Sequence, residues 1–107
     1  MTMSRTPEDV VSLYLRAQNL EQVRRTEDAV ALYEQAVQVG FDAAGPYDRL
    51  IAIYRGRDQH ADVVRIAEAA ITNVRTYPDK VKWYESLRDG AREALASQPD
   101  RRGAEFS

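Results

Sequence analysis

The segment Asp28–Val37, DAVALYEQAV, returns 34 residues later as Asp62–Ile71, DVVRIAEAAI. Four of the aligned positions carry identical residues, and two others exchange one aliphatic side chain for another. Within each segment the apolar residues recur every three or four positions, as they do on one face of an α-helix. A repeat of this length is typical of proteins that stack helix-turn-helix units.

A second amphipathic segment precedes the first copy, and the two are expected to form a helical hairpin. Residues 7–22 and residues from Thr26 onward have helical periodicity, with Thr6 and Thr26 as predicted N-caps. Gly40 lies where a left-handed residue would end the second helix. Only three or four residues join the helices, so the chain must reverse. The predicted inward-facing residues are Val10, Leu13, Ala17, Leu20, Ala29, Leu32, Tyr33, Ala36 and Val37.

The same organisation is predicted for the rest of the chain. A third helix starts at Pro46 and ends near Gly56, a fourth covers about residues 59–75, and a fifth begins at Pro78 and ends before Pro99. No stretch alternates apolar and polar residues between hairpin turns, so strands are not required. The predicted inward-facing residues are Tyr47, Leu50, Ile51, Tyr54, Val63, Ile66, Ala67, Ala70, Ile71, Val74, Tyr84, Leu87, Ala91 and Leu95.

The 34-residue unit resembles that of the tetratricopeptide repeat family, W-x2-L-G-x2-Y followed by A-x3-F and P. Ala29 and Tyr33 match the pattern in the first unit, and Leu50 and Tyr54 match it in the second. The pattern is not met at Arg16, Ile51 and Ala67, and neither unit has the closing proline in register.

The resemblance implies an all-α fold in which two antiparallel helix hairpins form a right-handed stack. One hairpin cannot bury both of its apolar faces, so a final helix should cover the open face of the second unit. The expected organisation is one domain over residues 1–107, with repeat 1 at 7–40, repeat 2 at 44–75, a capping helix at 78–97 and a tail at 98–107.

Composition narrows the classes of function. The chain has 107 residues, 44% hydrophobic and 30% charged, and a formal net charge of −2. A chain without a basic excess is not expected to bind nucleic acid through its overall charge. There is no apolar run of the roughly 18 residues that cross a bilayer, so we expect a cytoplasmic protein that binds no membrane.

No residues with the spacing of a catalytic or metal site are found. His60 is the only histidine and cysteine is absent, so thiolate chemistry and sulfur-ligated metals are excluded. The sequence contains no HExxH motif, no nucleophile elbow and no phosphate-binding glycine loop. We therefore expect no enzymatic activity, no catalytic residue, no metal and no cofactor.

Surface residues of the first helix in each unit are the predicted binding site. Stacked hairpins place these helices side by side, which makes one continuous groove with apolar contacts at one end and guanidinium donors at the other. Such a groove suits a peptide or partner protein with an acidic residue or a free carboxylate. The predicted groove residues are Val11, Tyr14, Leu15, Gln18, Arg49, Ala52 and Arg55.

Other interpretations remain open. Two chains could bury Val11 and Leu15 in a homodimer, and an RNA-binding helical repeat is a weaker alternative. Trp83 moves from the core to the groove edge if the register of the fifth helix changes by one residue. Members of the family that hold a terminal carboxylate use Lys, Asn and Arg residues on successive first helices. Only Arg49 matches that set here, so this mode of binding is not expected.

Overall fold

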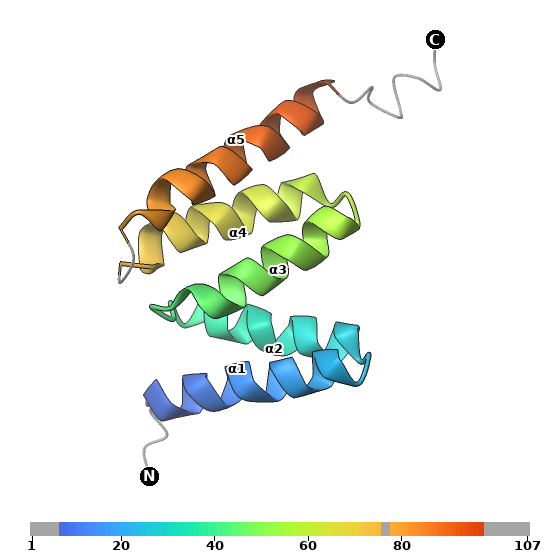
Figure 1. The fold of residues 1–107 in the computed structure, drawn as a ribbon, viewed down its shortest axis with the longest axis vertical. Helices are drawn as coiled ribbons and strands as arrows, with labels where there is room; N and C mark the ends of the chain where they lie inside the picture. The colour runs from blue at the N-terminus through green and yellow to red at the C-terminus, as the bar shows by residue number, and fades with distance from the viewer. Residues whose placement is uncertain (1–6, 76–77, 98–107) are drawn as a thin grey trace.

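The protein is described by a computed structural model that covers residues 7–75 and 78–97. These residues form five α-helices and no strand (Figure 1). The expectations for Thr6 and for the tail at 98–107 lie outside the described residues. The helices are α1 (Pro7–Gln22), α2 (Thr26–Gln38), α3 (Ala44–Gly56), α4 (His60–Asn73) and α5 (Lys80–Ser97).

The helices form a zigzag in which each one packs against its neighbours in the sequence (Figure 1). Consecutive helices run in opposite directions. Side-chain hydrogen bonds also connect alternate helices, joining α1 to α3, α3 to α5 and α2 to α4. The bundle therefore has an α1/α3/α5 layer and an α2/α4 layer.

The core follows the predicted periodicity. Among the residues that the structure describes, seventeen hydrophobic core residues are buried, all of them predicted to face inward, and Pro46 is buried as well. The largest fully buried side chains include Tyr33, Tyr47 and Tyr84. Each tyrosine hydroxyl donates a hydrogen bond, to a carboxylate or to the carbonyl oxygen of Phe41. These aromatic residues fill the core without leaving a buried hydroxyl unpaired.

Several details of the sequence prediction are wrong. The fifth helix begins at Lys80, two residues after Pro78, which lies in the preceding turn. Thr26 is the first residue of α2, and Arg25 holds the N-cap position without a side-chain hydrogen bond. The third helix begins at Ala44, two residues before Pro46, which lies inside its first turn. Leu95 is 43% exposed and does not belong to the core. Since α5 has 18 residues and α4 has 14, we attribute this exposure to the greater length of α5.

The turn after α2 explains the glycine at position 40. Gly40 has φ +71°, its N–H donates to the carbonyl of Val37, and the next N–H, from Phe41, donates to the carbonyl of Ala36. This pair of bonds is the Schellman motif. It requires a left-handed residue, as the sequence predicted.

The turns inside the two hairpins repeat each other 34 residues apart. Arg24 and Asp58 are the only non-glycine residues with positive φ in the described part of the chain, at 66° and 56°. The N–H of Arg25 donates to the carbonyl of Leu20, and that of Gln59 donates in the same way to Tyr54. The sequence repeat is therefore also a repeat of local backbone structure.

Replacing Gly40 with Ala should lower the free energy of unfolding by about 1 kcal/mol, since a left-handed L residue costs roughly 1–2 kcal/mol. The added Cβ would meet Asn73 Oδ1 at an ordinary 3.5 Å, so the backbone carries the cost. Arg24→Gly is the matched control and should leave stability unchanged or raise it. Urea unfolding followed by circular dichroism measures both, and a Gly40→Ala chain as stable as the native one would contradict the assignment.

Candidate functional site

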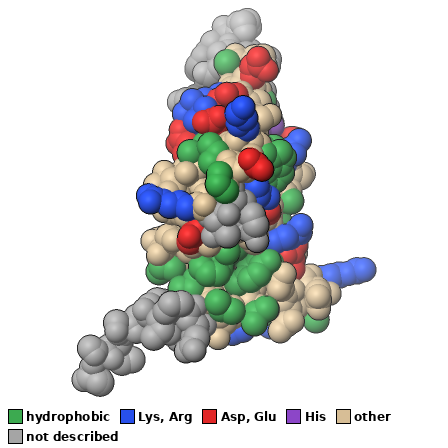
Figure 2. Space-filling model, turned by 60° about the vertical axis from the view of Figure 1, so that its left-hand side comes forward, with side chains coloured by type: hydrophobic (Ala, Val, Ile, Leu, Met, Phe, Trp, Pro, Cys, Tyr) green, Lys and Arg blue, Asp and Glu red, His purple; other side chains and the backbone are tan. Residues whose placement is uncertain are grey.

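The predicted groove residues lie on α1 and α3, in the α1/α3/α5 layer. Val11 and Leu15 are 42% and 52% exposed, and they lie one helical turn apart on α1, so their side chains are neighbours on its surface. Ala52 and Arg55 are also exposed, whereas Tyr14, Gln18 and Arg49 are half-buried. Figure 2 shows hydrophobic side chains gathered at the level of α1, and charged side chains crowded at the level of α5.

Tyr14 connects the two hairpins rather than standing free in a groove. A Cβ on Gly45 would lie 2.8 Å from Cε1 of Tyr14 and closer still to Cζ, so only glycine allows the ring to rest against the start of α3. Gln18 Nε2 donates to the Tyr14 hydroxyl at 3.0 Å, and the ring centroid of Tyr33 lies 6.0 Å away. Tyr14 therefore helps to form the floor between α1 and α3.

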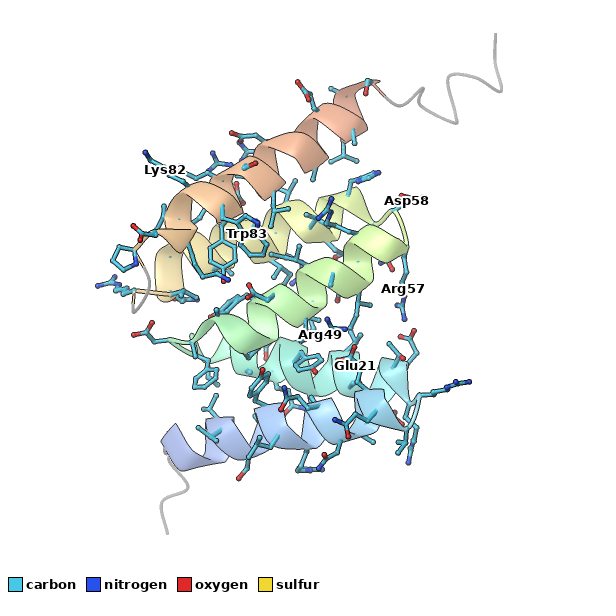
Figure 3. All side chains as sticks on the ribbon, viewed as in Figure 1. Glu21, Arg49, Arg57, Asp58, Lys82 and Trp83 are labelled. Carbon is cyan, nitrogen blue, oxygen red and sulfur yellow. The ribbon has the colours of Figure 1, made fainter. Side chains whose placement is uncertain are left out.

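Arg49 is held by a carboxylate of the same chain. Its Nε donates to Glu21 Oε1 at 3.1 Å, a second guanidinium nitrogen bonds Glu21 Oε2, and the Tyr33 hydroxyl donates to Oε1 at 2.7 Å. Figure 3 shows Arg49 and Glu21 facing each other between α3 and α1. The sequence analysis assigned Arg49 to ligand binding, but its guanidinium already has a bidentate partner within the chain.

The electrostatics of this cluster favour the charged forms. Hydrogen bonding from Arg49 lowers the pKa of Glu21 against the opposing effect of burial, and the same bond raises the pKa of Arg49. Burial and the hydrogen bond to Glu21 raise the pKa of Tyr33, so its hydroxyl stays protonated and donates. A shallow depression of about 250 Å³ lies over the cluster, lined by Gln18, Glu21, Gln22, Tyr33 and Arg49.

Trp83 belongs to the same layer, although the sequence left its position open. Its neighbour Tyr84 is fully buried and Trp83 is 44% exposed. The side chain extends from α5 toward α3, whereas Lys82 points away from the bundle (Figure 3). Lys80 Nζ lies 4.3 Å from the centroid of the Trp83 ring, a cation–π contact.

The 34-residue shift could have placed Trp83 in advance. Two successive shifts relate Leu15 to Arg49 and Arg49 to Trp83, and they relate Gln18 to Ala52 and Ser86. The repeat thus indicates that α5 continues the face that α1 and α3 present.

The described residues offer little for other chemistry. No group of three His, Cys, Asp or Glu residues within 7–75 and 78–97 could hold a metal ion. In the same part of the chain, no helix combines the length and the apolar character that crossing a membrane requires.

Replacing Glu21 with Gln tests the cluster through the pH dependence of stability. A carboxyl with a lowered pKa stabilises the fold above its unfolded value, here 4.5, and that stability is lost as the pH falls below it. Glu21→Gln should therefore destabilise the protein at pH 7, by about 1 kcal/mol for a half-solvated pair, and flatten the loss of stability in acid. The variant still contains Glu34, whose pKa is also lowered, so part of the loss of stability in acid should remain.

Glu27→Gln is the control for this experiment. Glu27 is 77% exposed in its pair with Arg57, and such pairs contribute little to stability. Thermal melts between pH 3 and pH 7, within the range where carboxylates titrate, give both effects. Equal acid sensitivity of the Glu21→Gln and native chains would contradict a stabilising Glu21 carboxylate.

Comparison of this chain with protein-family models, with curated proteins and with solved structures finds no match.

Proposed function

We propose that this chain is a non-enzymatic protein-interaction module that binds a peptide or a segment of a partner protein across its α1/α3/α5 layer. The observation that carries the proposal is the exposure of Val11 and Leu15, 42% and 52%, in a layer that also exposes Trp83. Exposed apolar side chains that lie close together on a helical layer mark surfaces for protein contact. The module would serve as an adaptor or scaffold.

The proposal includes a tetratricopeptide-like architecture, in which the hairpins form a right-handed stack with α5 as the capping helix. The equivalent turns at Arg24 and Asp58 support it, since they repeat with the period of the sequence. The two layers support it as well. Side-chain hydrogen bonds connect α1 to α3 and α3 to α5, and others connect α2 to α4, so equivalent helices of successive units lie in the same layer. This arrangement gives the ligand a wall made of α1, α3 and α5.

The residues of the wall have different roles in the proposed complex. Val11 and Leu15 supply apolar contact, and Ala52 leaves room for the ligand to approach α3 closely. Arg49 is held by Glu21, so its role is to shape the wall. Arg55 is exposed and is the cation of α3 that we assign to an acidic group of the partner.

A homodimer is the second candidate, because Leu15 is more than half exposed on α1, the first helix of the bundle. Light scattering on the native chain and on Leu15→Glu separates the two functions. A dimer that Leu15→Glu dissociates would favour self-association, and a monomer at high concentration would favour the groove.

The groove is tested by screening a peptide library displayed on phage. Arg49→Glu is unsuitable because it would place two carboxylates together and destabilise the fold. Ala52→Glu adds a charge to the exposed wall, and Ala31→Glu is the same substitution at an exposed alanine of α2, in the other layer. Selected peptides should lose at least about tenfold in affinity, 1.4 kcal/mol, on Ala52→Glu and keep their affinity for Ala31→Glu.

Thermal melts show whether both variants fold like the native chain. Peptides that bind the two variants equally well would show that the ligand lies elsewhere. A library without any enriched peptide would count against the proposed function.

A further inference from the structure

A cavity of about 400 Å³ lies where α3, α4 and α5 meet. It is larger than the depression over Arg49, and none of its lining residues belongs to that depression. Arg55 and Asp58 line it from the end of α3 and the turn that follows, His60 from the start of α4, and Ser86 from α5. A Cβ on Gly90, which also lines the cavity, would meet nothing within 4 Å.

Some cations of the α1/α3/α5 layer are paired with a described carboxylate, whereas Arg16, Arg55 and Lys82 are not, and of these three only Arg55 lines the cavity. Arg49 and Lys80 are paired with Glu21 and Asp48. Arg55 forms no ion pair with any described residue. Its guanidinium therefore keeps the planar set of donors that binds a carboxylate in a bidentate manner.

The other walls suit the rest of an acidic side chain. Leu87, Ala91 and Val63 supply apolar surface for its methylene groups. The Ser86 hydroxyl and the His60 ring carry hydrogen-bond donors at the same cavity. Asp58 is the one acidic residue of the lining, and its exposed carboxylate would repel an anionic ligand.

We propose that this cavity binds the carboxylate of a glutamate or aspartate side chain in the peptide partner, with Arg55 as the residue that recognises it. The inference rests on the proposed function and names the chemistry of the ligand at one end of the groove. A chain that lies across α3 and α5 can place a side chain in the cavity, because Arg55 and Ser86 line it from those two helices. Arg55 determines specificity, and Asp58 weakens the binding.

The fluorescence of Trp83 can measure peptide binding at this cavity directly. Trp83 is the only tryptophan in the chain, and it lies one helical turn before Ser86 and Leu87. The probes are three pentapeptides without tryptophan. The first is acetyl-Ala-Leu-Glu-Leu-Ala-amide, the second has Gln in place of Glu, and the third is the Gln peptide with a free C-terminal carboxylate.

The glutamate peptide should change the fluorescence of Trp83 in a saturable manner and bind at least about tenfold more tightly than its Gln counterpart. Arg55→Gln should abolish that preference. Asp58→Asn should raise the affinity by about threefold, because it removes a like charge and because Asn also tolerates the left-handed backbone. Arg57→Gln is the control and should change neither value, since Arg57 pairs with Glu27.

Equal binding of the glutamate and glutamine peptides, or no binding of either, would overturn the proposal. Preference for the peptide with the free terminus would overturn the assignment to a side chain.

The failure of the groove proposal can be distinguished from the failure of the cavity proposal. If library peptides lose affinity on Ala52→Glu but not on Arg55→Gln, the groove stands and the cavity proposal fails. If no library peptide binds, the groove fails, and the pentapeptides still test the cavity by themselves.

Discussion

Three carboxylates link the helices at the edge of the hydrophobic core, and each accepts a hydrogen bond from one tyrosine hydroxyl and pairs with one cation. A buried phenol must find a hydrogen-bond partner, and a carboxylate in the same place must keep its charge balanced. Each cluster meets both requirements at the edge of the core, and each spans at least two helices. The clusters are Tyr33–Glu21–Arg49, Tyr54–Glu34–Arg65 and Tyr84–Asp48–Lys80.

Apolar periodicity predicted most of the fold because it is a local property of the sequence. The spacing of buried residues places one face of each helix in the core whatever that face touches. The prediction was wrong where the outcome depends on a neighbour. Leu95 keeps the period of α5 but is exposed. Thr26 has the chemistry of an N-cap, yet the chain turns one residue earlier, through the left-handed Arg24.

Some features of the candidate site could likewise be predicted from local periodicity, whereas others depend on residues distant in the sequence. The exposure of Val11 and Leu15 follows from their angle to the inward face of α1, and the sequence predicted it. The pairing of Arg49 with Glu21 joins residues 28 positions apart. Because no helical period relates these two residues, the pair could not be predicted from the sequence, and Arg49 was assigned to ligand binding instead. The place of Trp83 depends on the register of α5, which the burial of Tyr84 fixes and which the 34-residue shift already indicates in the sequence.

These clusters also determine which charges remain for binding. Most of the cations that line the helices already have a carboxylate in the same molecule, so they stabilise the stack and a ligand would have to displace their partners. Displacing Glu21 from Arg49 would also unpair the Tyr33 hydroxyl. A cation without such a partner can bind an acid at no cost to the fold. Arg55 meets this condition beside a cavity, which is why stability and recognition can depend on different arginines of one helix.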